Sequence, residues 1–471
     1  MGEKPPAKPV VQFFLCYYIC MEQSFFFYDL ETSGLNPRED RIMQFAGQRT
    51  DMELKPIGEP VNILVKLCND TLPSPYAIMV TKITPLSTQM DGLTEAEFCN
   101  YVTEEIFTEG TIATGYNSVR FDDEFMRATF WRNFYDPYEF EWRDGRSRWD
   151  LLDVVRMTRA LRPENINWPV TEEGKATNRL ELMTKLNGIE HESAHDALSD
   201  VNALIGVTRL IRDKQPQLYK YLFEMREKKA VMKLVNLEHP QPFVYTSGRY
   251  SGEFGKTTVA FPIAPSKNSG VLVFDLRYNL DELLTDKERK SYYPIVKEMK
   301  YNRCPCVAPL GVLTQADGWK KIKLDQETIE KNKASLLAHP DFIERMRTEN
   351  EEKPEFPPAV DSESALYDCF LDDKDRRVCL AVRRASRADL AHFEPEFDDE
   401  RLPELLLHYK ARNFEDVLTE SEHQKWEEYR LGRINSHKDA YIKAIQELAA
   451  KGENMALLQD LQDWYQSLLP Y

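Results

Sequence analysis

The stretch SFFFYDLETSG, residues 24 to 34, decides the fold class. It begins with a run of aromatic residues, which is typical of a strand buried on both faces. Two acidic residues, Asp29 and Glu31, follow two positions apart. Side chains alternate along a strand, so both carboxylates leave the same face near its carboxyl end. Open α/β sheets bind ligands at that end, so the stretch predicts an α/β sheet with an acidic site at its edge.

Outward from this strand, the chain to about residue 210 alternates strand-like and helical patterns, as an α/β layer fold does. Further strands are expected in RIMQFAGQRTD (41–51), PVNILVKL (60–67) and GTIATGYN (110–117). Helices are expected over TEAEFCNYVTEEIF (94–107), RWDLLDVVRMTRAL (148–161) and AHDALSDVNALIGVTRLIRD (194–213). Thr94 is the candidate N-cap of the first helix.

The sequence pattern changes after about residue 216. Short apolar runs broken by Gly, Pro and Ser predict a small β-rich domain; they are PFVYTSGRY (242–250), KTTVAFPIAP (256–265) and GVLVFDLRY (270–278). The segment ENEEKPEFPP (349–358) combines charges with prolines and is interpreted as a linker. Beyond it the patterns are helical, so an all-helical C-terminal domain is expected.

Composition limits the class of protein. A chain of 471 residues is too long for one ordinary core, so two or three domains are expected. Apolar residues make up 42% and charged residues 30%, a normal globular mixture. The net charge of −17 argues against coating nucleic acid by bulk attraction but leaves room for a local basic channel. The eight cysteines form no C-x-x-C pair, which favours reduced thiols in a cytoplasmic protein.

The first 23 residues are interpreted as a leader of uncertain structure. VVQFFLCYYICM, residues 10 to 21, is apolar and follows Lys4 and Lys8, loosely as in a signal peptide. It is too short to span a bilayer, and no small-x-small cleavage site follows it. An extra strand, or a segment upstream of an alternative start at Met21, is the preferred interpretation.

Two further acidic positions extend the candidate site. Asp122 follows a short expected strand and can face the cleft, whereas Asp123 and Glu124 suit the role of dipole partners in a first helical turn. Asp200 lies at the rim of the apolar stripe of its helix, where an acid needs a partner. Carboxylates are the ligands that hard divalent cations such as Mg²⁺ prefer, so these acids predict a metal site.

The stretch GIEHESAHDALSDV, residues 188 to 201, supports two interpretations. It contains the pattern H-E-x-x-H from His191 to His195, which on a helix binds zinc in metalloproteases. It also places His195 five residues before Asp200, which suits a different chemistry. Asn187 and Gly188 disfavour a helix before His191, and the downstream histidines form no recognisable third-ligand pattern. The zinc metalloprotease is therefore the less favoured alternative.

Taken in order on an α/β scaffold, these clusters resemble the DEDD superfamily of 3′→5′ exonucleases. The resemblance is to the subclass whose catalytic histidine lies five residues before the last aspartate. It implies two Mg²⁺ ions per active site, with Mn²⁺ as a substitute. The implied metal ligands are Asp29, Glu31, Asp122 and Asp200. The implied general base is His195, which completes the catalytic set.

The resemblance extends along most of the chain, to the exodeoxyribonuclease I family of bacterial enzymes specific for single strands. The similar motifs are GYNSVRFDDE (115–124), RNFYDPY (132–138), SRWDLLDVVR (147–156), ALRPENINWP (160–169), NGIEHESAHDALSDV (187–201) and LLLHYKARNF (405–414). The family implies an RNase H-like exonuclease domain with a mixed sheet, an SH3-like β-rich domain and an all-helical C-terminal domain. The expected boundaries are a leader at 1–23, the exonuclease domain at 24–213, the SH3-like domain at 214–352 and the helical domain at 353–471.

The expected chemistry explains this choice of residues. Two metal ions clamp the attacking and leaving oxygens when a phosphodiester is hydrolysed in line, and four carboxylates offset their charge. A neutral histidine accepts the water's proton near neutral pH, and His195 is expected to do so. His191 and Glu192 are then loop residues, so His191→Ala is expected to be nearly silent.

The segment 120–148 interleaves arginines with aromatic residues. This composition suits a single strand, whose phosphates meet cations and whose bases stack on rings. Aromatic residues at helical spacing are more often core, which is the interpretation for Phe125 and Phe130. The arginines are Arg120, Arg127, Arg132, Arg143, Arg146 and Arg148. The resemblance implies the substrate contacts Glu31, Arg127, Tyr138, Trp142, Arg156 and Arg179.

The expected activity is processive, metal-dependent 3′→5′ hydrolysis of single-stranded DNA to 5′-mononucleotides, in DNA repair and recombination. The implied partners are single-stranded DNA and the acidic C-terminal tail of single-stranded DNA-binding protein; Lys410 and Arg412 are only candidates for the surface that binds the tail. A monomer without a membrane partner is expected. A 3′→5′ exoribonuclease of the same superfamily is the main alternative, because no residue reads the 2′-OH directly. A catalytically inactive DNA-binding scaffold is a further one.

Overall fold

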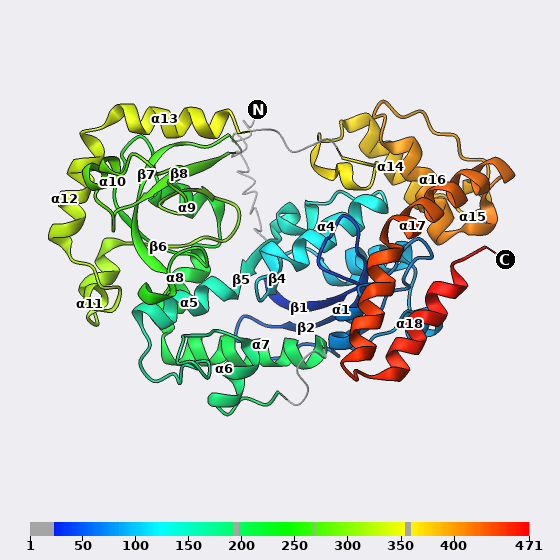
Figure 1. Cartoon of the computed structure of the whole chain (residues 1–471), viewed down its shortest axis with the longest axis horizontal. Helices are drawn as coiled ribbons and strands as arrows, with labels where there is room; N and C mark the ends of the chain where they lie inside the picture. The colour runs from blue at the N-terminus through cyan, green and yellow to red at the C-terminus, as the bar shows by residue number, and fades with distance from the viewer. Residues whose placement is uncertain (1–22, 192–196, 268, 354–358, 471) are drawn as a thin grey trace, which may run out of the picture.

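The structure is a computed structural model that describes residues 23–191, 197–267, 269–353 and 359–470. Figure 1 shows three regions: one around strands β1 to β5, one around β6 to β8, and a helical region toward the C-terminus. The segment expected to be a leader lies outside the described residues, apart from residue 23.

The first region is built on a five-stranded mixed sheet in the order β3-β2-β1-β4-β5. Strands β1 and β2, and β2 and β3, are antiparallel, whereas β4 runs parallel to β1 and to β5. The strands are β1 (Ser24–Thr32), β2 (Ile42–Thr50), β3 (Val61–Leu64), β4 (Thr111–Gly115) and β5 (Ser147–Asp150). The expected strands are therefore all present.

Strand β1 lies at the centre of this sheet because its aromatic residues are buried on both faces. Phe25 and Phe27 belong to one apolar core, and Phe26 and Tyr28 belong to another on the opposite face. All four are at most 1% exposed. The alternation of side chains along a strand explains how one run of rings supplies two cores.

Helices cover both faces of the first sheet. Helix α7 packs against β1 and β2, whereas residues of α3 and α4 pack against Phe26 and Tyr28 on the other face. The helices are α1 (Pro75–Thr81), α2 (Pro85–Asp91), α3 (Glu95–Tyr101), α4 (Asp122–Arg132), α5 (Leu151–Leu161), α6 (Leu180–Leu186) and α7 (Ala197–Lys214). Thr94 caps α3, as predicted. The helix expected from residue 148 begins three residues later, because β5 takes up its first residues.

The second region contains an antiparallel five-stranded sheet in the order β10-β6-β7-β8-β9. Its strands are β6 (Phe243–Thr246), β7 (Thr257–Pro265), β8 (Gly270–Asp275), β9 (Val296–Lys300) and β10 (Cys306–Pro309). Its helices are α8 (Pro216–Glu224), α9 (Lys228–Leu234), α10 (Leu280–Thr285), α11 (Gly318–Lys321), α12 (Gln326–Leu337) and α13 (Pro340–Glu351). The expected linker starts too early at residue 349, because α13 continues to Glu351.

The third region is helical, and the described residues 359–470 contain no strand. Its helices are α14 (Asp373–Arg384), α15 (Arg387–Leu390), α16 (Leu402–Asn413), α17 (Glu420–Ala450) and α18 (Met455–Ser467). Helices α17 and α18 return to the first region and pack near α1 and α2. The prediction of a helical C-terminal part is therefore correct.

The first and second regions share one apolar core. Trp149 and Val154 of the first region belong to the same buried cluster as Val259 and Phe261 of the second. Helix α5 lies between them and contacts strands β6, β7 and β10. Burial of apolar surface therefore holds these two regions together.

A buried network of charges joins the first region to the third. Glu363 forms ion pairs with Arg41, at 3.1 Å, and with Arg412. His408 Nδ1 lies 2.9 Å from the same carboxylate. Asp70 pairs with Arg412 at 2.7 Å and with Arg41 at 3.3 Å. The side chains of Glu363 and Asp70 are fully buried, so this contact depends on matched charges in a dry interior.

None of the helices in the described part of the chain is long and apolar enough to cross a bilayer. The six described cysteines, which are Cys68, Cys99, Cys304, Cys306, Cys369 and Cys379, are all free thiols. Reduced cysteines were expected from their spacing, and these six agree with that expectation.

Candidate active site

Strand β1 places two carboxylates on one face of the first sheet. Asp29 and Glu31 share the face of Phe25 and Phe27, because side chains alternate along a strand. Helix α7 packs on this face. Pairing of β1 with β4 ends at Phe27, so the two acids stand beyond the point where these strands part.

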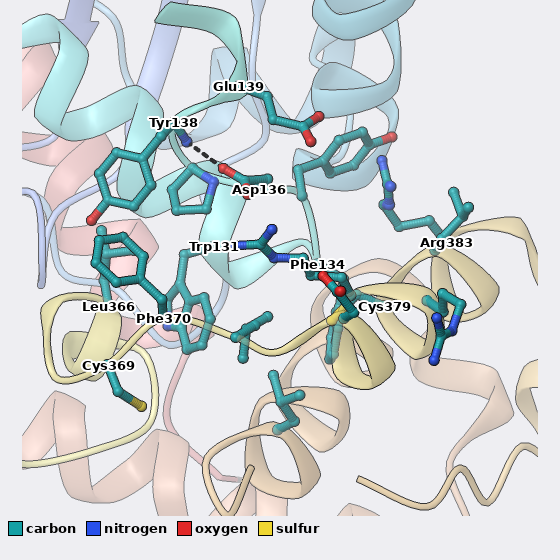
Figure 2. Close-up of a pocket in the computed structure, with 18 of the residues that line it drawn as sticks. Trp131, Phe134, Asp136, Tyr138, Glu139, Leu366, Cys369, Phe370, Cys379 and Arg383 are labelled. Carbon is teal, nitrogen blue, oxygen red and sulfur yellow. Dashed lines mark hydrogen bonds between the residues drawn. The ribbon is translucent and has the colours of Figure 1, made fainter. Parts of the chain in front are cut away.

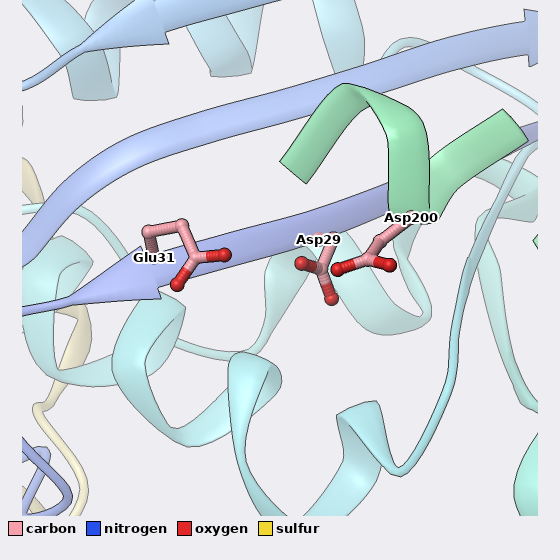
Figure 3. Close-up of side chains that lie close together, drawn as sticks. All are labelled: Asp29, Glu31 and Asp200. Atoms are coloured by element: carbon pink, nitrogen blue, oxygen red, sulfur yellow. The ribbon is translucent and has the colours of Figure 1, made fainter. Parts of the chain in front are cut away.

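Asp200 reaches the same point from the first turn of α7. Figure 3 shows Asp29 and Glu31 on the strand, with Asp200 descending from the helix beside them. One ligand oxygen from each of the three lies within 4.8 Å of the others. The structure thus brings together three of the four carboxylates that the sequence predicts as metal ligands.

The fourth carboxylate, Asp122, lies at the side of the same strand. It is 4% exposed in the first turn of α4, and its Oδ1 accepts a hydrogen bond of 3.2 Å from the Leu30 backbone N–H. Leu30 lies between Asp29 and Glu31, so Asp122 is fixed to the strand that carries them. Among the described residues, the group whose ligand oxygens lie within 4.8 Å of one another does not include Asp122.

Burial and repulsion by neighbouring carboxylates make Asp29 and Asp122 hard to ionise. Burial raises the pKa of Asp29 well above its ordinary value, and the carboxylates of Asp122, Glu31 and Asp200 raise it further. Burial, together with the neighbouring Asp123, raises the pKa of Asp122 to about 8. A nearby divalent cation favours the charged forms, and an oxygen-only donor set is what hard cations prefer. The residues present therefore fit a hard divalent cation.

The raised pKa of Asp122 predicts a particular pH dependence of stability in metal-free protein. The folded state holds this proton up to about pH 8, whereas the ordinary pKa is 3.8. The folded state binds more protons between these values, so the contribution of Asp122 to the free energy of unfolding falls as pH rises. We expect Asp122→Asn to lose less stability than wild type between about pH 5 and about pH 8, measured by urea denaturation in EDTA. A steeper loss in the variant would contradict this.

Residues 188–201 contain both His195 and the H-E-x-x-H pattern, and only part of this stretch belongs to the described residues. Residues 192–196, with His195 among them, lie outside the described residues, so the role of His195 stays a prediction. His191 lies in a loop, as expected, and its Nε2 is 2.6 Å from Asp200 Oδ1. In the described part of the chain, the group able to hold a metal consists of the three carboxylates and excludes His191. The zinc alternative gains no support there.

All of the predicted substrate contacts except Arg127 retain some exposed surface. Trp142 is 64% exposed, and the Arg179 side chain is 73% exposed. The Arg156 side chain is 19% exposed and forms an ion pair of 2.6 Å with Asp153. These three side chains are accessible from solvent.

Arg127 differs from them because it is only 4% exposed. It pairs with Glu124 at 2.8 Å and with Glu141 at 2.6 Å. Its guanidinium carbon lies 5.4 Å from the centre of the Tyr138 ring, within the range of a cation–π contact. Arg127 therefore holds Tyr138 in place and has its charge matched by two carboxylates.

Two other arginines of the segment 120–148 also have buried partners. Arg132 pairs with Glu95 at 2.8 Å, and Arg148 pairs with Asp123 at 2.5 Å. Asp123 is thus part of an ion pair in the core, more than a dipole partner at the surface. The mixture of arginines and rings in this segment reflects core packing as much as a surface for a single strand.

A pocket of about 360 Å³ lies beside Tyr138, between the first and third regions. Figure 2 shows the rings of Tyr138 and Phe370 next to each other at one end of it, with centroids 5.8 Å apart. Phe370 is 78% exposed. Trp131, in the last turn of α4, and Phe134, just after the helix, line the pocket. The third region thus adds an exposed ring next to a predicted substrate contact.

Asp150 was not singled out from the sequence, yet it holds the loop that leads into α4. Its carboxylate accepts hydrogen bonds from the backbone N–H groups of Asn117, at 2.9 Å, and Val119, at 3.2 Å. It also caps α5 through the N–H of Leu152. The position of this loop determines where α4 begins and therefore where Asp122 lies. An aspartate directly before a helical pattern is an N-cap signal, which was present in the sequence.

Three family models match the chain. The model described as Exonuclease matches residues 26–208, the Exonuclease I SH3-like domain matches 226–350, and the Exonuclease I C-terminal domain matches 360–468. The predicted fold class, an exonuclease domain followed by an SH3-like domain and a helical C-terminal domain, is confirmed. The predicted domain boundaries stay predictions.

Relatives and solved structures agree with these models. Exodeoxyribonuclease I of Haemophilus influenzae is 38% identical and that of Escherichia coli 35% identical, over 95% of this chain and 99% and 98% of theirs. The structure of E. coli exonuclease I with a dA16 oligonucleotide has a TM-score of 0.89 at 35% identity, covering 95% of this chain and 100% of that one. A zinc-bound complex of the E. coli enzyme with single-stranded DNA has a TM-score of 0.88, also at 35% identity, covering 95% of this chain and 99% of that one. A structure of SSB/exonuclease I with the inhibitor CFAM has a TM-score of 0.86 at the same identity, covering 95% and 100%.

Proposed function

Because this chain belongs to the exodeoxyribonuclease I family, we propose that it hydrolyses single-stranded DNA from the 3′ end and releases 5′-mononucleotides. The observation that carries the proposal is the meeting of Asp29, Glu31 and Asp200. They meet in a chain that matches nuclease relatives over 95% of its length. Solved structures of the E. coli relative contain single-stranded oligonucleotides, which supports this class of substrate.

Two Mg²⁺ ions per active site are proposed, with Mn²⁺ as a substitute. Asp29, Glu31, Asp122 and Asp200 would hold them. Bound there, the metals would activate water and stabilise charge on the phosphoryl oxygens. Burial and repulsion leave Asp29 and Asp122 in need of positive charge, which supports the assignment. Glu31 is also proposed to contact the substrate.

His195 is proposed as the general base that takes the proton of the attacking water. A neutral imidazole has a free nitrogen lone pair for that proton and can release it to solvent near neutral pH. The proposal rests on the position of His195 five residues before Asp200 and on the family resemblance. The oxygen that attacks the phosphorus thereby gains nucleophilic character as its proton moves to the ring nitrogen.

His195→Ala is expected to lower kcat by about 10² to 10⁴ while metal-dependent binding of a single strand remains. Loss of the base removes proton transfer but leaves the carboxylates and the substrate contacts in place. The measurements are single-turnover hydrolysis and fluorescence anisotropy with a labelled oligonucleotide. His392→Ala, an exposed histidine of the third region, is the matched control. Turnover of His195→Ala close to wild type would remove His195 from the mechanism.

The partly or fully exposed members of the predicted substrate contacts are proposed to bind the strand. Trp142 and Tyr138 offer ring faces for stacking, while Arg156 and Arg179 offer cations for phosphates. Arg127 is proposed to act mainly through Tyr138, since two carboxylates already match its charge. This arrangement contacts the backbone and base faces, so it does not depend on the base sequence.

The experiment that tests the function compares single-stranded DNA, duplex DNA and RNA, each labelled at the 3′ or the 5′ end. We expect mononucleotides to be released from the 3′ end of single-stranded DNA with Mg²⁺, and no release with EDTA. Release from the 5′ end or a preference for duplex would contradict the proposal. A preference for RNA would instead identify a 3′→5′ exoribonuclease, since the 2′-OH is the feature that separates the two substrates.

The wider role is proposed on the same basis. Processive digestion, a place in DNA repair and recombination, and action as a cytoplasmic monomer are proposals from the family. The acidic C-terminal tail of single-stranded DNA-binding protein is the proposed partner, and a solved SSB/exonuclease I structure of a similar chain supports it. The proposed boundaries of the three domains are 24–213, 214–352 and 353–471.

A further inference from the structure

His191 connects helix α6 to the candidate active site. Its Nε2 lies 2.6 Å from Asp200 Oδ1, and its Nδ1 lies 3.1 Å from Thr184 Oγ1. The His191 side chain is 5% exposed, and Thr184 is fully buried in α6. The imidazole is therefore enclosed. One ring nitrogen contacts Thr184 of α6, and the other contacts Asp200, a proposed metal ligand.

The contact with Asp200 indicates which nitrogen carries the proton in the neutral ring. The Asp200 carboxylate can only accept, so Nε2 is the donor in this contact. Nδ1 then has a lone pair 3.1 Å from Thr184 Oγ1, and the single hydroxyl hydrogen of Thr184 is shared with the backbone carbonyls of Leu180, at 3.1 Å, and Glu181, at 2.9 Å. The contact with Thr184 on one side and the hydrogen bond to Asp200 on the other fix the ring and hold the carboxylate.

We propose that His191 is a positioning residue that holds Asp200 in the orientation needed for binding a divalent cation together with Asp29 and Glu31. The inference rests on the proposed function of these carboxylates. Ordering the Asp200 side chain before the cation arrives lowers the entropy lost on binding. A carboxylate has about four lone-pair sites, so the bond from His191 is compatible with cation binding.

This inference changes the meaning of the H-E-x-x-H pattern. Its first histidine does not belong to the metal-binding group in the described part of the chain, yet it touches a member of that group. The expectation that His191→Ala is silent is therefore replaced by an expected loss of metal affinity. Hydrogen-bonding partners of metal ligands typically contribute about 10- to 100-fold to metal affinity.

The test compares two amides at position 191 in the full chain. The amide of Gln reaches about as far as Nε2 and can still donate to Asp200, whereas the amide of Asn lies near the place of Nδ1 and keeps only the contact to Thr184. We expect His191→Gln to bind Mn²⁺ with nearly wild-type affinity. We expect His191→Asn and His191→Ala to bind it about 10- to 100-fold more weakly. Electron paramagnetic resonance of free Mn²⁺ measures the affinity without substrate.

The kinetic readout separates positioning from catalysis. For His191→Asn, the Mn²⁺ concentration at half-maximal rate should rise while kcat at saturating Mn²⁺ stays close to wild type. His239→Ala, an exposed histidine of the second region, is the control and should change neither. Thermal unfolding in EDTA checks that both amide variants fold.

The outcomes separate this inference from the proposed function. Wild-type Mn²⁺ affinity in His191→Asn would overturn the inference even if the protein is an active nuclease. Equal loss in the Gln and Asn variants would show that donation to Asp200 is not what matters, and would also overturn it. Failure of wild-type protein to digest single-stranded DNA would instead overturn the proposed function, whatever the Mn²⁺ affinities.

Discussion

Asp29→Asn is expected to lower the rate of single-strand hydrolysis by about three orders of magnitude. The substitution removes one ligand from the carboxylate group and weakens charge stabilisation in the transition state by about 4 kcal/mol, and each 1.36 kcal/mol corresponds to about a factor of ten. Single-turnover hydrolysis of a 3′-labelled oligonucleotide at saturating Mg²⁺ measures the rate.

The same substitution is expected to raise the stability of metal-free protein. Asp29 is half-buried beside three other carboxylates that oppose its ionisation, so a neutral amide of the same size removes this repulsion. Lost activity combined with a higher Tm in EDTA excludes unfolding as the cause. Asp213→Asn, an exposed position at the far end of α7, is the control and should leave both quantities unchanged. Activity within a factor of ten of wild type would show that Asp29 is not a metal ligand.

Glu363→Ala is expected to lower the free energy of unfolding by about 3 to 5 kcal/mol. Burial alone would raise the pKa of Glu363, but Arg412, Arg41 and His408 hold it well below its ordinary value, so the carboxylate is charged. Its removal leaves two buried guanidiniums with less negative charge to match them. Urea denaturation near pH 7 measures the difference.

Glu453→Ala, at an exposed position between α17 and α18, is the matched control and should change stability by less than about 0.5 kcal/mol. The effect of Glu363→Ala should shrink in acid. Its pKa is lowered in the folded state, so its contribution is present above the ordinary value of 4.5 and is lost as pH falls below it. An equal effect of both substitutions at neutral pH would show that the buried network does not stabilise the protein.

The features that could be predicted from the sequence are those with a local signal. The aromatic run before Asp29 and its spacing to Glu31 were enough to predict a buried strand with two acids on one face. Thr94, as a candidate N-cap, predicted the start of α3. In each case the residues that make the structure are neighbours in sequence, so periodicity and capping rules apply directly.

The features that could not be predicted depend on residues far apart in the chain. Arg41 and Glu363 form an ion pair although more than three hundred positions separate them, and no sequence pattern near either residue predicts this pair. Arg132 and Arg148 looked like candidates for a basic surface because a sequence does not show which arginines find a buried carboxylate. The H-E-x-x-H match at His191 had no predicted role, because the contact of His191 with Asp200 forms only when α6 and α7 lie side by side.

The apolar core that Trp149 and Val154 share with Val259 and Phe261 has a consequence for cooperativity. A family model can treat the first two regions as separate modules, but neither can unfold without exposing part of the other's interior. Heating should therefore melt residues 24–350 in a single calorimetric transition, with equal van't Hoff and calorimetric enthalpies for that part of the chain. Two regions that separate family models match would then unfold as one cooperative unit in this protein.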